Sequence, residues 1–176
     1  MPFATSPAEY PAPVTRWLDE EELAAWVRLV AVVELLPGVL DSQLRRDSGL
    51  THFEYYTMAM LSEAPDRTLR MTGLAARTNA TLPRLSHVIR RLEARGLVER
   101  AACPQDARAT NARLTDAGFA AVEAAAPGHV ETVRGYVLDA LDRDQLLRLG
   151  EAAEAILGRL DPEGSFGGPL RRPRRP

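Results

Sequence analysis

The chain lacks several patterns that mark common classes of protein. Its 176 residues include no lysine and a single cysteine, Cys103, which excludes an intramolecular disulfide framework. The sequence has no glycine-rich phosphate loop and no serine, cysteine or lysine in a recognisable nucleophile motif. Its three histidines, His52, His87 and His129, are far apart and show no metal-ligand spacing. These absences argue against an enzyme, a metal site and a bound cofactor.

Long apolar runs and targeting signals are missing as well. Residues 1–13 are rich in proline and alanine but lack the charged start and apolar core of a secretory signal. No uninterrupted apolar stretch approaches the roughly 20 residues that span a bilayer. With 45% hydrophobic and 26% charged residues, the composition is that of one globular domain. We therefore expect a soluble cytoplasmic protein.

The formal net charge of −2 hides an uneven distribution of charge. Between Arg67 and Arg113, ten arginines stand against three acidic residues, a local net charge of +7, while the remainder carries −9. A basic segment of this kind can neutralise DNA phosphates and release their counterions. The alternative to DNA binding is that these arginines only form a solvated helix face, which is the better explanation for an isolated basic helix.

Residues 69–115 have the order of a short strand, two helices and a hairpin. The first helix is predicted over 73–77, with Thr72 as its N-cap, and is followed by a turn at Asn79 and Ala80. The second helix is predicted over 82–95, with Thr81 as its N-cap and Gly96 as its stop. Strands are predicted over 97–100 and 111–114, with a turn-rich tip over 103–108. This order indicates a winged helix-turn-helix.

The second helix has one apolar side and one basic side. Spacings of three, four and seven place Leu85, Val88, Ile89 and Leu92 on a single inward face. Pro83 falls in the first turn, where its missing N–H costs little. The outward face comprises Arg84, Ser86, His87, Arg90 and Arg91. Because this basic face coincides with the second helix of the motif and precedes a basic hairpin, it predicts DNA binding.

These residues resemble the MarR family of transcriptional regulators. The resemblance runs from about residue 20 to about 160, and its most specific parts are residues 70–75, 85–93, 96–98, 106–108 and 114–118. It implies a homodimer on a pseudo-palindromic operator, with recognition helices in major grooves and wings in minor grooves. Arg108 matches the family's wing-tip arginine and Asp106 the acid that orients it, whereas Ala107 stands where a second arginine is frequent. The predicted DNA contacts are Thr81, Pro83, Arg84, Ser86, His87, Arg90, Arg91, Asp106 and Arg108.

The flanking segments are predicted to be helical and to mediate dimerisation. We expect helices over 20–46, interrupted or kinked at Pro37 and Gly38, over 51–62, from Thr115 to about Ala140, and from Asp142 to about 160. Their apolar surface exceeds what the winged helix can cover, which favours pairing with a second chain. The expected division is an arm (1–18), a dimerisation helix (19–50), the winged-helix region (51–115), C-terminal dimerisation helices (116–161) and an Arg- and Pro-rich disordered tail (162–176).

The resemblance also implies a small-molecule effector, often aromatic or phenolic, between the DNA-binding and dimerisation parts. Candidate lining residues are Trp26, His52, Tyr55, Tyr56 and His129, although ordinary core packing explains Trp26 and Tyr56 singly. The expected function is a ligand-relieved repressor. The alternative is a small-molecule-binding or sequestering helical dimer with a vestigial DNA-binding region. Cys103 is expected to be a filler residue, because the family's peroxide-sensing cysteine lies near the N-terminus, where this chain has none.

Overall fold

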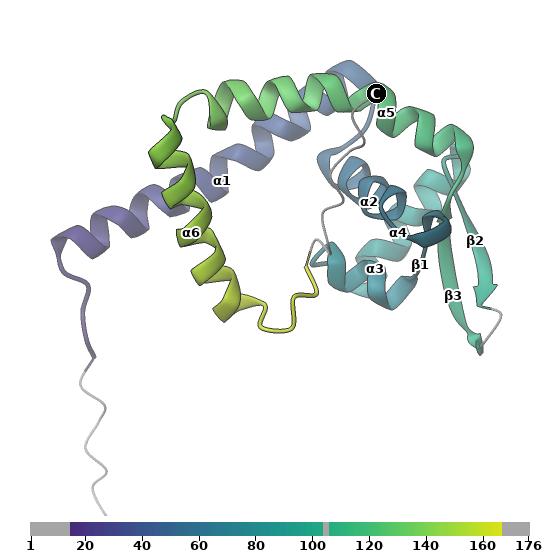
Figure 1. Cartoon of the computed structure of the whole chain (residues 1–176). Helices are drawn as coiled ribbons and strands as arrows, with labels where there is room; N and C mark the ends of the chain where they lie inside the picture. The colour runs from purple at the N-terminus through teal and green to yellow at the C-terminus, as the bar shows by residue number, and fades with distance from the viewer. Residues whose placement is uncertain (1–14, 104–105, 167–176) are drawn as a thin grey trace, which may run out of the picture. The chain divides into compact units, whose positions relative to one another are not determined.

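The computed structural model describes residues 15–103 and 106–166, and for residues 103 and 106–109 the backbone alone. Helices alternate with three short strands (Figure 1). The elements are α1 (Glu20–Ser48), α2 (His52–Ser62), the short turn η1 (Pro65–Arg67), β1 (Thr68–Arg70), α3 (Met71–Arg77), α4 (Leu82–Ala94), β2 (Val98–Cys103), β3 (Asp106–Leu114), α5 (Asp116–Val133), the π-helical η2 (Arg134–Leu138) and α6 (Arg143–Leu160). The predicted class, mainly α with a small β wing, is confirmed.

The chain divides into two compact units within α1, between residues 36 and 37. In the N-terminal unit, Asp19 begins the helix: its carboxylate accepts the N–H of Glu22 at 2.8 Å, and its own N–H donates to the Glu22 carboxylate at 3.0 Å. The helix is continuous through Pro37 to Ser48, so of the two predicted alternatives the interruption is wrong and the kink stays a prediction. Proline removes one helix hydrogen bond, which neighbouring turns can tolerate.

By length and composition, α1 is the single helix within 15–103 and 106–166 that is apolar enough to cross a membrane. Arg28 and Glu34 break its apolar run, and core helices of soluble proteins meet the same criterion. The indication is therefore weak. Most large apolar side chains of the N-terminal unit are exposed within the single chain, among them Leu23, Val27, Val33 and Leu35.

In the second unit, α2 is the central element of the winged-helix region. Its predicted capping box is confirmed: the Thr51 hydroxyl accepts the Glu54 N–H at 3.1 Å, and the Glu54 carboxylate accepts the Thr51 N–H at 2.8 Å. Burial extends around most of the helix and includes Glu54, Tyr55, Thr57, Met58, Met60 and Leu61. The core is completed by apolar side chains from the end of α1, α3, α4, the sheet and the first half of α5.

The three strands form an antiparallel sheet in the order β1-β3-β2. Leu69 of β1 pairs with Ala112 of β3, and Val98 of β2 pairs with Leu114. The hairpin strands are longer than the sequence predicted: β2 reaches Cys103 and β3 begins at Asp106, so the predicted tip is largely strand. Figure 1 shows the hairpin extending beyond the helices, as a wing does.

The helix-turn-helix itself is closed by short backbone bonds. After α3, Asn79 adopts a left-handed φ of 47°, and the N–H of Ala80 donates to the Ala75 carbonyl at 2.9 Å. Gly96 (φ 70°) ends α4 in the same way. Thr81 caps α4 as predicted. The predicted cap at Thr72 is wrong, because α3 begins at Met71, two residues before the predicted start, and Arg70 is at the N-cap.

The C-terminal helices carry on the helical pattern with one irregularity. Thr115 caps α5 as predicted, and the helix continues through Pro127 before passing into the unpredicted π-helical segment η2. Asp142 and Gln145 form the predicted cap of α6. No residue of α6 is buried, and the end of the helix lines a cavity together with the end of α3.

Candidate nucleic-acid interface

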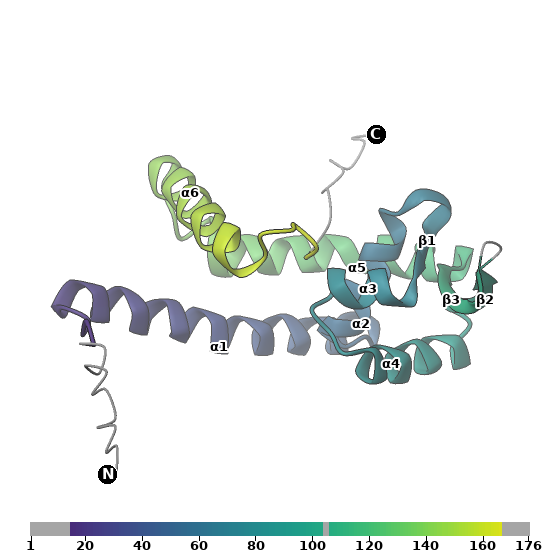
Figure 2. The same cartoon turned by 90° about the horizontal axis from the view of Figure 1, so that it is seen from below.

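Helix α4 buries one side and exposes the other. Leu85, Ile89 and Leu92 are fully buried and Val88 nearly so, which confirms the predicted inward stripe. The rest of the helix forms three lines of residues along its outer surface. Figure 2 shows α4 at the outer edge of the winged-helix region.

The line opposite the core consists of Pro83, His87 and Arg90, at spacings of four and three residues. All three side chains are exposed. Among the residues that the structure describes, Arg90 has no hydrogen-bond or ion-pair partner. Its guanidinium is thus free to meet a phosphate or a guanine edge, which arginine recognises with two parallel hydrogen bonds.

A second line of α4 faces α2. The Arg84 guanidinium lies over the Phe53 ring, 4.3 Å from its centroid. Arg91 forms an ion pair at 2.8 Å with Glu54, whose side chain is 1% exposed, and Arg95 approaches the same carboxylate at 4.0 Å. The predicted DNA residues Arg84 and Arg91 are therefore exposed but also hold α4 against α2.

The third line of α4 faces the wing. Arg100 of β2 donates from Nη2 to the Ser86 carbonyl at 2.8 Å and to the Ser86 hydroxyl at 3.2 Å. Its backbone N–H donates to the Glu93 carboxylate at 3.1 Å, and its Nε lies 3.4 Å from the same group. Sequence reasoning missed this role of Arg100 and the burial of Glu54, because both depend on contacts between elements.

The wing carries a further ion pair between its strands, Arg113 with Glu99 at 2.9 Å. The backbone of Asp106 and Arg108 lies in β3. The side chains of both residues fall outside the described part of the structure, so their predicted roles stay predictions.

Four of the five predicted effector-lining residues come together between α2 and α5. The His129 ring lies 6.2 Å from the His52 ring and 4.8 Å from the Tyr55 ring, and His52 lies 6.4 Å from Tyr56. Two histidines that are far apart in sequence are thus neighbours in space. Trp26 belongs to the other compact unit, where its side chain is exposed. No group of three metal-ligating side chains occurs among the described residues.

Burial sets the protonation of this aromatic cluster. It lowers the pKa of His52, although the nearby Asp41 carboxylate opposes the shift. It also lowers the pKa of His129, which the charge of His52 lowers further. The pKa values of Tyr55 and Tyr56 are raised by burial. The cluster therefore favours neutral side chains, which suit an aromatic ligand.

Two cavities in the described part of the chain are lined by residues other than this cluster. One, of about 300 Å³, is lined by the end of α3, the end of α6 and the turn after α6. Phe166 in that turn lines it and lies 5.9 Å from Tyr56, which links cavity and cluster. Neither Phe166 nor this turn was predicted, since the Gly- and Pro-rich sequence after Asp161 has no helical or strand period.

A helix-turn-helix with a β-hairpin wing and an exposed arginine on its second helix defines a winged-helix protein of the DNA-binding type. A family model described as MarR family matches residues 48–109. The chain is 41% identical to Sco3205, a MarR family transcriptional regulator from Streptomyces coelicolor solved in complex with DNA, over 86% of this chain and 95% of that one, with a TM-score of 0.81. This chain belongs to the MarR family of transcriptional regulators, whose members are not enzymes.

Two further solved structures are similar. AbsC, a MarR family regulator from Streptomyces coelicolor, is 36% identical over 85% of this chain and 100% of its own, with a TM-score of 0.79. CouR from Rhodococcus jostii RHA1, solved with p-coumaroyl-CoA, is 19% identical over 78% of this chain and 92% of its own, with a TM-score of 0.68, a likeness of fold alone. No match was found among curated protein sequences.

Proposed function

We propose that this chain is a sequence-specific, dimeric repressor of transcription that a small aromatic ligand releases from DNA. The observation that carries this proposal is the exposed line of Pro83, His87 and Arg90 on α4, the helix that β2 of the wing contacts through Arg100. The complex of Sco3205 with DNA supports it, because that protein shares 41% of its residues with this chain. A soluble, cytoplasmic protein follows from this role.

In this proposal α4 enters the major groove and the wing reaches the minor groove. His87 and Arg90 face base edges, with Thr81 and Pro83 at the leading end of the helix. Arg84, Ser86 and Arg91 flank this line, and Asp106 and Arg108 serve the wing. Bidentate contact of an arginine with guanine contributes about 1–3 kcal/mol of discrimination per base.

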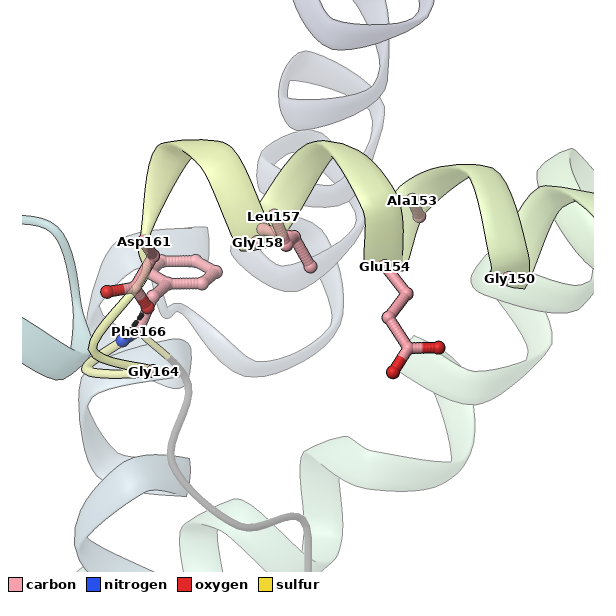
Figure 3. Close-up of a pocket in the computed structure, with 8 residues that line it drawn as sticks. All are labelled: Gly150, Ala153, Glu154, Leu157, Gly158, Asp161, Gly164 and Phe166. Carbon is pink, nitrogen blue, oxygen red and sulfur yellow. Dashed lines mark hydrogen bonds between the residues drawn. The ribbon is translucent and has the colours of Figure 1, made fainter.

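The dimer is supported by the surface of α6. A cavity of about 400 Å³ is lined on one side of α6 by Gly150, Ala153, Glu154, Leu157 and Gly158, and at its end by Asp161, Gly164 and Phe166. Figure 3 shows these lining residues. Small residues leave room for a second helix to approach closely. Because no residue of α6 is buried within one chain, a helix of the second copy is the occupant we propose.

The effector site proposed here is the cluster of His52, Tyr55, Tyr56 and His129. It joins α2 of the winged-helix region to α5, so a ligand that spreads these helices would change the spacing of the two recognition helices. CouR, which binds the phenolic thioester p-coumaroyl-CoA, supports an aromatic ligand in this fold.

Selection of duplex DNA from a random pool, followed by binding titrations, tests the function. We expect one enriched pseudo-palindrome with half-sites about 10 base pairs apart. Arg90→Ala should weaken binding by about 1–3 kcal/mol and relax the base preference at the position it contacts. Arg134→Ala, in a surface pair with Asp139 outside the winged-helix region, is the control and should bind normally. Failure to enrich any sequence would contradict the proposal.

A further inference from the structure

One side chain connects the wing to the recognition helix at two points. Arg100 projects from β2 onto α4, where Ser86 and Glu93 lie seven residues, about two helical turns, apart. The guanidinium binds Ser86 through its carbonyl and its hydroxyl and lies beside the Glu93 carboxylate. The backbone N–H of Arg100 donates to Glu93 as well. Helix α4 and strand β2 are thus fixed along two turns.

These contacts are more buried than a surface ion pair of the same hairpin. The side chains of Arg100 and Glu93 are 30% and 31% exposed, whereas those of Arg113 and Glu99 on the same hairpin are 56% and 51% exposed. Nη2 of the planar guanidinium donates to a carbonyl and a hydroxyl while Nε lies 3.4 Å from a carboxylate, an arrangement that lysine does not reproduce. An isolated exposed pair would contribute little.

We propose that Arg100 is a positioning residue, which fixes the wing relative to the recognition helix so that both reach DNA as one unit. In this arrangement the Ser86 hydroxyl serves as an anchor for Arg100 and does not read a base. This inference rests on the DNA binding proposed above. It adds a role for three residues, Ser86, Glu93 and Arg100, that lie beside the contacting face.

Two other roles for Arg100 make different predictions. A direct phosphate contact would be retained in part by Arg100→Lys, and its loss would reduce the salt dependence of binding by about one counterion. A role in stability alone would lower the melting temperature without changing the affinity of the folded protein. A positioning role raises the dissociation constant only for DNA long enough for the wing to reach, and lysine does not restore affinity.

The test uses full-length protein and two duplexes built on the sequence selected from a random pool. One duplex includes the flanks that the wings would reach, and the other ends before them. We expect Arg100→Gln and Arg100→Lys to weaken binding to the long duplex about tenfold, with less than about twofold effect on the short one. Arg113→Gln, which breaks the exposed pair on the same hairpin, is the matched control and should bind both duplexes normally.

Ser86→Ala tests the anchor. This smaller change provides a folded variant in case the Arg100 variants do not fold. Ser86→Ala should weaken binding to the long duplex alone. Combining it with Arg100→Gln should add little, because both changes remove the contact between Ser86 and Arg100. Additive effects, rescue by lysine, or equal losses on both duplexes would overturn the inference while leaving DNA binding intact. A wild-type protein that selects no sequence would instead overturn the proposed function itself.

Discussion

Gly118 lies in the first turn of α5, where the helix meets the link between α4 and the wing. The Thr115 hydroxyl donates to the Gly96 carbonyl at 2.7 Å and accepts the Gly118 N–H at 3.0 Å. This draws the backbone so close that a Cβ built on Gly118 would lie 2.0 Å from the Leu97 carbonyl oxygen. The requirement for glycine here is one of space, since the obstacle is backbone.

Gly118→Ala is therefore expected to destabilise the fold by about 1–3 kcal/mol, as overpacking does. Gly73→Ala is the control: Gly73 is also helical, but nothing lies within 4 Å of its added Cβ. Alanine there should leave stability unchanged or raise it, because it favours helix over coil. Chemical denaturation measures both, and equal midpoints for the two variants would contradict the steric argument.

The Glu54 carboxylate is the most buried charge in the described winged-helix region, at 1% exposure. It caps α2 and pairs with Arg91, so Glu54→Gln removes the charge that both contacts use. We expect a loss of about 1–3 kcal/mol of unfolding free energy. The matched change Glu99→Gln, in an exposed pair, should cost less than about 1 kcal/mol. Similar losses in thermal unfolding would show that burial of Glu54 contributes nothing.

Among the elements, α4 was predictable because its signals are local. Thr81, the apolar spacing from Leu85 to Leu92 and Gly96 all act within a few residues, and each is confirmed. The two ends of the wing strands were placed wrongly, because pairing with β3 extends β2 beyond its apolar residues. Pairing partners lie outside any local window.

The other residue roles that could not be predicted from the sequence depend on contacts between elements. Glu54 was recognised as a cap but not as a buried partner of Arg91, and Arg100 was read as an ordinary strand residue. The neighbouring rings of His52 and His129 come from helices separated by most of the winged-helix region. Only the packing of α2 against α5 brings such residues together.

That α2–α5 junction should make stability depend on pH. Burial lowers the pKa of His52 and His129 below the ordinary value of 6.5, so just below that value the unfolded chain binds more protons. Their contribution is full above the ordinary pKa and is lost as pH falls below it. We expect a lower melting temperature at about pH 5.5 than at about pH 7.5, and a smaller difference in His129→Phe.

The melting temperatures are compared between about pH 5.5 and about pH 7.5. The carboxyl groups of Asp41 and Asp47, whose pKa values are lowered, titrate at more acidic pH. Asp41 also faces His52, whose backbone N–H it accepts at 2.8 Å. A flat melting profile in the wild type, or an unchanged profile in His129→Phe, would show that the two rings are not held neutral by the fold.

At the scale of the whole molecule, apolar surface is left without a partner. In the described part of the chain, the exposed large apolar residues concentrate on the helices outside the winged-helix region, among them Trp26, Val33, Leu147, Leu157 and Leu160. Soluble monomers rarely expose so many such side chains on neighbouring helical turns. The dimer proposed above would cover identical surfaces on both chains at once, as a twofold axis requires.

Leu157→Glu tests this at the cavity on α6. Leu157 lines the cavity and is 47% exposed in one chain, so a single chain tolerates a charge there while a dimer buries it unpaired. We expect the dimer dissociation constant in sedimentation experiments to rise at least about a hundredfold. Leu82→Glu, at a leucine 45% exposed at the start of α4, should leave the dimer intact. A wild type that sediments as a monomer, or an unaffected Leu157→Glu dimer, would exclude α6 as the interface.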